Sequence, residues 1–291
     1  MEKKDVYQMV TDRVMEQLKN GVCPWQRPWS GTAGTINYVT RKPYSFLNQV
    51  LLGREGEWMT FRQCKQLGGS IKKGAKAGMV VYYSTYTVTK EKKEDGDEKT
   101  VASIREIPIL RYYNVFHVSD CEGIESKMLD ETPVETCQPI ETAEAIINDY
   151  VSREDGLSFD NTNLSNRAYY SPSIDTVVVP MLKQYAITEE YYSTVFHELT
   201  HSTMKESRCN RRADNAHYTR RSKEYSREEL VAELGAAMLC TKSGLDCDKA
   251  FNNSVAYIQG WLRALSNDKK MIVWAASRAE KAAKYILNEH E

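Results

Sequence analysis

The sequence predicts an α+β protein of two domains, in which a small α+β domain precedes a mostly helical domain with a short sheet. The chain has 291 residues, of which 41% are hydrophobic, so it can form one large or two ordinary cores. Strand-like segments are concentrated in residues 1–120, and helical periodicity dominates residues 141–291. An acidic stretch with two prolines separates them at 121–140, and we expect it to be the linker.

The elements of the first domain follow from periodicity and from turn residues. Apolar side chains recur at helical spacing in 5–20, and Gly21 marks the end of that helix. A loop rich in Pro, Trp and Gly comes next. We then expect two short helices at 44–53 and 60–68, followed by a strand rich in Val, Tyr and Thr at 80–89. A charged hairpin tip at 90–99 leads to one or two returning strands at 101–118.

The second domain is predicted to begin with a helix at 141–152. Two strands are expected around a Pro-Ser turn at 169–170 and 176–179, and Pro180 ends the second of them. Four further helices are predicted at 188–205, 226–240, 250–265 and 269–288.

Charge and cysteine content exclude several classes of protein. The net charge of −1 gives no sign of a nucleic-acid partner for the molecule as a whole. The seven cysteines are odd in number and form no CxxC pair, which excludes a zinc ribbon or a thioredoxin-like motif and indicates free thiols in a reducing compartment. No signal-peptide core or long apolar run is present. We therefore expect a soluble, cytoplasmic protein without a membrane partner.

The motif His197-Glu198-Leu199-Thr200-His201 is HExxH. On a helix, residues four apart lie on one face, so two imidazoles can bind a single Zn²⁺ ion. The intervening Glu198 is then placed to act as the general base of a metallopeptidase. Thr188 is the predicted N-cap, and acidic residues follow it in the first turn.

A third ligand is needed for a tight zinc site. Ser207 stands where a metzincin has histidine, which excludes that class. Glu229 and Glu233 share one face of the next predicted helix. We assign Glu229 as the ligand, as in gluzincins, and Glu233 as the carboxylate that accepts a hydrogen bond from a ligand histidine. The reverse assignment stays open, and His217 is a rival ligand.

A substrate cleft is expected beside the metal. The strand Asp175–Val179 precedes the motif helix, and the edge strand of a zincin binds an extended peptide by strand addition. Asp175, Tyr169 and Tyr170 are its candidate residues, with simple core or edge positions as the alternative for each tyrosine.

The N-terminal half is locally basic. Residues 41–83 contain eight basic and two acidic residues, a local charge of +6, interleaved with aromatic residues. Cations that follow phosphates and aromatic rings that stack on unpaired bases are what single-stranded nucleic acid requires. The loop tryptophans stand between prolines and are hard to bury. The candidate DNA-binding residues are Trp25, Arg27, Trp29, Arg41, Lys42, Arg62, Lys72, Lys73 and Lys76.

Motifs in both halves resemble those of the ArdC antirestriction family, and they follow in the right order over nearly the whole chain. The N-terminal module also occurs in TraC-type conjugative primases and phage polyvalent proteins. The matching segments are PWQRPW (24–29), PYSFLN (43–48), WMTFRQ (58–63), KKGAKA (72–77), YYNVFHV (112–118), YYSPSID (169–175), YYSTVFHELTHST (191–203), EELVAELGAAML (228–239) and YIQGWLRAL (257–265). Thr203 departs from the family, which often has an aromatic residue there.

The resemblance implies a single-stranded-DNA-binding domain, a zincin-like peptidase domain and a role on mobile elements in shielding incoming DNA from restriction. It also implies His197, His201 and Glu229 as zinc ligands. Two other interpretations remain: a DNA-binding shield whose zinc is not catalytic, and an intracellular peptidase whose basic half recognises a protein.

Overall fold

The computed structural model describes residues 5–25, 34–92, 101–128, 139–162, 167–211, 223–246 and 255–289. Its N-terminal half contains α1 (Val6–Lys19), β1 (Thr35–Asn37), α2 (Phe46–Leu52), β2 (Gly56–Thr60), α3 (Phe61–Gln66), β3 (Ser70–Ile71), β4 (Gly78–Lys92), β5 (Val101–His117), η1 (Val118–Asp120) and β6 (Cys121–Glu122). Its C-terminal half contains α4 (Pro139–Arg153), β7 (Ser158–Asp160), β8 (Tyr169–Ser171), β9 (Thr176–Val178), η2 (Leu182–Gln184), α5 (Thr188–Ser202), α6 (Lys223–Ser243), α8 (Val255–Ser266) and α9 (Met271–Ile286). The predicted α+β class is confirmed.

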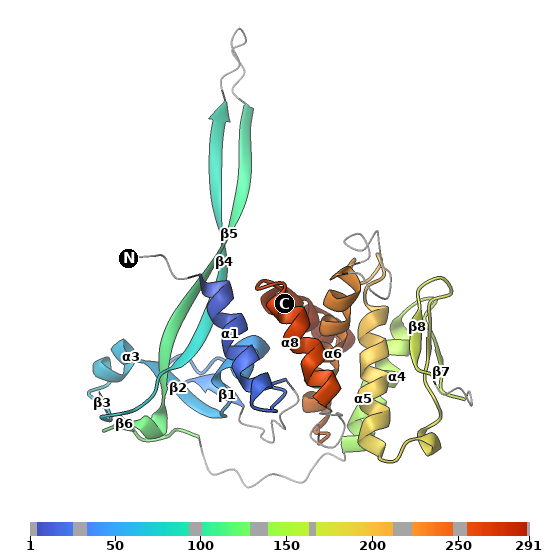
Figure 1. The fold of residues 1–291 in the computed structure, drawn as a ribbon, viewed down its shortest axis with the longest axis horizontal. Helices are drawn as coiled ribbons and strands as arrows, with labels where there is room; N and C mark the ends of the chain where they lie inside the picture. Colours follow the sequence, from blue (N-terminus) through green and yellow to red (C-terminus); the bar gives the residue numbers. More distant parts are fainter. Residues whose placement is uncertain are drawn as a thin grey trace.

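A four-stranded sheet in the order β1-β2-β5-β4 forms the N-terminal half. β1 is parallel to β2, and the other neighbours are antiparallel. β4 and β5 pair from Gly78 opposite Val115 to Lys92 opposite Val101. Figure 1 shows these two strands projecting from the body as a long ribbon. The strand predicted at 80–89 was too short, because the first residues of the expected hairpin tip belong to β4, whereas the returning strand predicted at 101–118 agrees with β5. Residues 93–100 lie outside the described residues.

Short strands were missed by the sequence prediction. β2 connects directly to α3 through Thr60, whose hydroxyl accepts a hydrogen bond from Gln63 N at 3.2 Å while Gln63 Oε1 accepts one from Thr60 N at 2.8 Å. This capping box starts the helix at once, so no loop signal separates strand from helix. β1 and β7 have only three residues each, too few for an alternating pattern to be recognised.

α2 covers part of the open edge of β4. The side chain of Asn48 donates to Val81 O at 2.9 Å and accepts from Val81 N at 2.7 Å. This buried amide replaces a neighbouring strand at one position and fixes α2 beside the sheet.

The two halves share one continuous apolar core. Val10, Val14 and Leu18 of α1 are fully buried and belong to the same cluster as residues of α5, α6 and α9. Thr11 Oγ1 donates to Lys269 O at 2.8 Å, which ties α1 to the turn before α9. The halves are therefore joined by packing as well as by the chain that connects them.

Trp25 lies inside this shared core. Its side chain is 0% exposed, and its ring contacts that of Trp261 edge-on at 6.0 Å. The prediction that Trp25 stacks on DNA is therefore wrong in this structure, because no face of the ring is open to a base. Packing against α8 supplies the enclosure that the local Pro-rich sequence did not reveal.

The stretch predicted as a linker, 121–140, is attached to the N-terminal half at its start. β6 pairs with β3, and Tyr38 Oη donates to Glu125 O at 2.9 Å. Lys127 N donates to Glu57 Oε2 at 2.8 Å. Pro139 already belongs to α4, and 129–138 lie outside the described residues. Among the helices described, none has the length and apolarity to cross a membrane.

Candidate metal centre

α5 carries the HExxH motif on a well-packed helix. Val195, Phe196 and Leu199 are fully buried on its inner side, as their apolar spacing predicts. The N-cap is Ile187 and makes no side-chain capping bond, so the prediction of Thr188 as N-cap was wrong by one residue. Glu189 and Glu190 do occupy the first turn, where they complement the helix dipole.

Three potential ligand atoms converge where α5 meets α6. His197 Nε2 and His201 Nε2 are 3.1 Å apart. Glu229 Oε1 lies 3.5 Å from His201 Nε2, and Glu229 Oε2 lies 3.7 Å from His197 Nε2. Ligand atoms at about 2.0–2.1 Å from a tetrahedral zinc are separated by about 3.3 Å. The three side chains therefore have the spacing and the donor types of a divalent-metal site.

The charges around the two histidines are unequal. Burial, reinforced by His201, lowers the pKa of His197. Burial also lowers the pKa of His201, but Glu228 and Glu229 outweigh it and raise this pKa above its usual range. Carboxylates thus stabilise a positive charge at this position, and a metal cation is a charge of that kind.

Glu228 is the carboxylate behind the ligand histidine. It is fully buried, and its Oε1 lies 3.6 Å from His201 Nδ1, slightly longer than a standard hydrogen bond. Arg211 holds it through Nη2 to Oε1 at 2.7 Å and Nε to Oε2 at 3.1 Å. The geometry therefore gives Glu228 the position that the sequence analysis assigned to Glu233.

Glu233 faces α8 instead. Its Oε2 accepts a hydrogen bond from Tyr257 Oη at 2.9 Å. Burial raises the pKa of Glu233 to about 7, and the nearby Glu229 adds to this. Assigning Glu233 as the acceptor for a ligand histidine was wrong, because Glu233 lies one turn further along α6 than Glu229, where its carboxylate meets Tyr257 of α8.

Glu198 lies beside the cluster and is almost completely buried. Burial raises its pKa to about 7, although the positive charge of His201 opposes the shift. The backbone N–H of Tyr170 favours the charged carboxylate and so also opposes the rise in pKa. A carboxylate with a pKa near neutrality can take up and release a proton at physiological pH.

The edge strand beside α5 is β8, in a sheet of order β7-β9-β8. The predicted edge strand, Asp175–Val179, corresponds to β9 and lies in the middle, so that assignment was wrong. Tyr169 is 46% exposed on β8, and Tyr170 Oη donates to Asp175 Oδ1 at 2.8 Å.

Asp175 does not line an open cleft. It is buried at a positive φ of 48°. Arg208 donates to both of its carboxylate oxygens at 2.9 and 2.8 Å, and Lys205 Nζ donates to Oδ2 at 2.5 Å. Arg208 also donates to Glu154 at 2.8 Å. The prediction of Asp175 as a substrate residue is corrected: it fastens the turn between β8 and β9 to the segment after α5.

The predicted DNA-binding residues fall into three groups. Arg27 and Trp29 lie outside the described residues, as does the rival ligand His217. Arg41 pairs with the buried Glu57, and Lys72 Nζ donates to Ser119 O at 2.8 Å. Both of these residues are nevertheless exposed, as are Lys42, Arg62, Lys73 and Lys76, for which no such contact is found among the described residues.

Comparison with known proteins finds two families, each matching a different part of the chain. The family described as the N-terminal domain of anti-restriction factor ArdC matches residues 4–116, and a zincin-like metallopeptidase family matches residues 148–278. Two crystal structures of the antirestriction ArdC protein from the R388 plasmid, one metal-free and one bound to Mn(II), have TM-scores of 0.71 and 0.70, with 30% and 31% identity. Each comparison covers 98% of both chains.

The chain belongs to the ArdC antirestriction family.

Two DNA primases TraC of Escherichia coli are 31% and 30% identical over 98% of this ArdC-family chain, which spans only 27% and 20% of their length. The protein y4eC of Sinorhizobium fredii (strain NBRC 101917 / NGR234) is 28% identical, with 97% of this chain and 91% of y4eC covered. The ArdC-like unit thus matches both a chain of similar length and a minor part of much longer chains.

The departure from the ArdC family pattern at Thr203 has a structural role. Thr203 is fully buried, and its hydroxyl donates to Thr200 O at 2.7 Å and accepts from Arg211 Nη1 at 2.7 Å. Arg211 also donates to Thr200 O at 2.9 Å. Thr203 therefore helps to hold the arginine that orients Glu228. Neither Glu228 nor Arg211 was predicted from the sequence. The only signal for Glu228 was its place next to Glu229, the assigned ligand.

Proposed function

We propose that this chain is an antirestriction protein that binds single-stranded DNA and carries a zinc-dependent peptidase centre. The observation that carries the catalytic part is the convergence of His197, His201 and Glu229 beside the buried Glu198. The DNA-binding part is supported by the family membership and by the basic, aromatic composition of the N-terminal half.

His197, His201 and Glu229 would hold the ion. Two imidazoles and one carboxylate are a set that suits zinc. Structural zinc sites normally have four protein ligands, whereas the cluster found among the described residues has three, as in catalytic sites. When bound, zinc acts as a Lewis acid and lowers the pKa of water toward neutrality.

Glu198 would act as the general base and then as the general acid. Its carboxylate is almost completely buried beside the ligand cluster, where it could take a proton from water and pass it on. We propose that a peptide substrate lies along β8, past Tyr169 and Tyr170, because β8 is an edge strand packed beside α5.

The metal assignment is tested by titrating the chelator-treated protein with zinc. We expect one ion per chain, and we expect Glu229→Gln to weaken its binding by at least about 10-fold. The matched control Glu206→Gln changes an exposed carboxylate just beyond α5 and should leave the affinity unchanged. Equal affinities in the two variants would remove Glu229 from the ligand set.

The catalytic assignment is tested with unfolded, fluorescently labelled casein. We expect the zinc-loaded protein to cleave it, and we expect Glu198→Gln to keep zinc but lose cleavage. Cleavage that persists in Glu198→Gln would exclude Glu198 as the base. A zinc-loaded protein that binds DNA without cleaving casein would favour the DNA-binding shield with a non-catalytic metal.

The DNA-binding part is tested by fluorescence anisotropy with a labelled oligothymidylate and a matched duplex over a salt series. We expect tighter binding of the single strand and a logarithmic affinity that falls with the logarithm of salt concentration. Absence of binding at low salt would favour a peptidase whose N-terminal half recognises a protein.

A further inference from the structure

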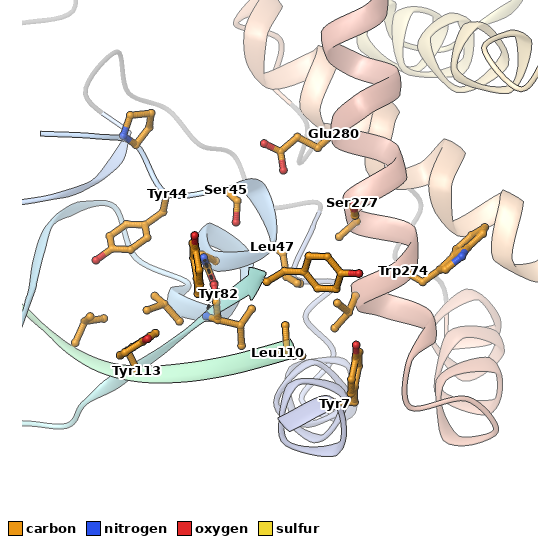
Figure 2. Close-up of a pocket in the computed structure, with 18 of the residues that line it drawn as sticks. Tyr7, Tyr44, Ser45, Leu47, Tyr82, Leu110, Tyr113, Trp274, Ser277 and Glu280 are labelled. Atoms are coloured by element: carbon orange, nitrogen blue, oxygen red, sulfur yellow. Dashed lines mark hydrogen bonds between the residues drawn. The ribbon is translucent and has the colours of Figure 1, made fainter. Parts of the chain in front are cut away.

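A cavity of about 830 Å³ lies between the N-terminal sheet and the C-terminal helix α9. Figure 2 shows Tyr44, Tyr82 and Tyr113 on the side formed by the sheet and the α2 region, with Ser277 of α9 across the space and Trp274 on the other side of that helix. The volume is in the upper part of the range of roughly 300–1,000 Å³ found for ligand sites. Neither the predicted metal centre nor the predicted basic residues line it.

Tyrosine rings dominate the sheet side of this cavity. Tyr82 is 60% exposed, Tyr83 is 55% exposed and Tyr113 is 44% exposed. Tyr113 is opposite Val80 in the β4–β5 register, so its ring and that of Tyr82 are diagonal neighbours on one face of the ribbon. Large exposed rings gathered in a hollow indicate a binding surface.

Cations accompany these rings. Arg111 is directly opposite Tyr82 in the register and is exposed. On the other side of the cavity, the Arg278 guanidinium stacks over the ring of Trp274, 4.0 Å from its centroid. Lys270 Nζ lies 5.5 Å from the ring centroid of Tyr7.

The acid in the cavity lining is partly compensated. Glu280 lies on α9, and its Oε1 is 3.7 Å from Lys284 Nζ, one helical turn further on. The cavity lining therefore combines aromatic side chains of the sheet with the positive charges of Lys270 and Arg278 on the opposite side. A peptide requires neither several exposed aromatic rings nor this charge, whereas nucleobases and phosphates match them.

We propose that this cavity is a cleft for unpaired nucleobases, in which bases stack on Tyr82 and Tyr113 and the adjoining phosphates lie near Arg278 and Lys270. The inference rests on the proposed DNA binding and deepens it by naming the site. Trp274 has a positioning role, because it holds the Arg278 guanidinium as a flat platform, and bases stack on such planes. Single strands are specified, because the bases of a duplex are already stacked and paired.

In this arrangement the C-terminal half takes a direct part in DNA binding. Trp274 and Arg278 lie on α9, and Lys270 is the N-cap residue of that helix. The cleft also differs from a site on the basic residues near α3 and β3. Figure 1 shows α3 and β3 on the side of the N-terminal half that faces away from α6 and α8. The two surfaces can therefore be separated by mutation.

The test compares two labelled single strands in the full-length protein, an oligothymidylate and the same backbone with most bases replaced by abasic sites. The wild-type protein should bind the abasic strand more weakly, because stacking on protein rings is lost. The Tyr82→Ala/Tyr113→Ala variant should bind oligothymidylate about 5- to 100-fold more weakly. This variant should no longer distinguish the two strands, whereas Lys72→Ala/Lys73→Ala should still distinguish them.

Leu182→Ala is the control, because Leu182 on η2 is as exposed as Tyr113 and lies away from the cavity. It should bind both strands as the wild type does. Arg278→Ala should flatten the salt dependence of binding by about one unit if it contacts a phosphate.

The inference is overturned if the double tyrosine variant keeps the wild-type preference for oligothymidylate; the proposed DNA binding would then stand at another surface. It is also overturned if that variant loses affinity for unfolded casein and not for DNA, which would make the cleft a protein site. Failure of the wild-type protein to bind any single strand would instead refute the proposed function itself.

Discussion

Gly235 of α6 lies directly against Thr200 of α5, at the level of the candidate metal centre. A Cβ atom at position 235 would be 2.6 Å from Thr200 Cγ2 and 2.7 Å from Thr200 Oγ1. Carbon atoms normally approach to about 3.5–4.0 Å, so roughly 1 Å of space is missing. Thr200 is fully buried and donates to Phe196 O at 2.7 Å, so its side chain cannot turn away without losing that bond.

We therefore expect Gly235→Ala to force α5 and α6 apart. Alanine gains up to about 1 kcal/mol in helix propensity over glycine, but overpacking of this kind costs about 1–3 kcal/mol. The clash should outweigh the propensity in the wild-type background. In Thr200→Ala, where Cγ2 and Oγ1 are absent, only the Cβ of residue 200 remains close, at 3.2 Å from the added Cβ, so the same change should cost much less. The expected coupling between the two positions is about 1–3 kcal/mol.

The assay is urea unfolding of the chelator-treated wild type, the two single variants and the double variant. A second measurement, zinc affinity, should fall in Gly235→Ala and recover in the double variant, because Glu229 and His201 are carried by the two helices that separate. A coupling below about 0.5 kcal/mol, or a zinc affinity unchanged in Gly235→Ala, would refute the conclusion that this contact sets the helix spacing.

Three further predictions follow from single contacts. Trp25→Ala should lower the free energy of unfolding by about 3–5 kcal/mol, measured in urea; a loss below about 1 kcal/mol would contradict its burial. Glu228→Gln should weaken zinc binding by about 10–100-fold through His201, with a smaller effect from Glu233→Gln; the opposite order would restore Glu233 as the orienting carboxylate. Burial lowers the pKa of His117 below its usual 6.5, so the folded protein favours the neutral imidazole. The stability that His117 contributes is present above pH 6.5 and is lost as the pH falls through the lowered pKa. The stability advantage of wild type over His117→Gln should therefore shrink between about pH 7.5 and pH 5.5, and a gap independent of pH would contradict this.

The candidate ligands could be predicted because helical spacing fixes them. His197 and His201 are four residues apart, so any helix brings them to one face. Glu229 could be chosen only as one of two acids on the next helix, and the structure favours it because α6 presents it to both histidines. Glu228 was not predictable, because its position depends on Arg211, which approaches from a separate segment.

The fold was predictable where elements are long and periodic. α1, α5, α6 and the paired strands β4 and β5 carry patterns that extend over many residues. β1, β2 and β7 do not, and their pairing depends on partners far along the chain. The burial of Trp25 is of the same kind, since its partner Trp261 lies in the last quarter of the sequence.

The packing of α1 against the last helices also bears on the order in which the protein folds. The bond from Thr11 to Lys269 joins residues 258 positions apart, and contacts of such separation form late because a long loop must close first. During synthesis, α1 emerges well before α8 and α9, because the other described elements all lie between them in the sequence. Until those helices emerge, Val10, Val14 and Leu18 lack the cover that they provide. A chain interrupted after the N-terminal half would therefore expose an apolar stripe, and we expect such a fragment to aggregate or to be degraded.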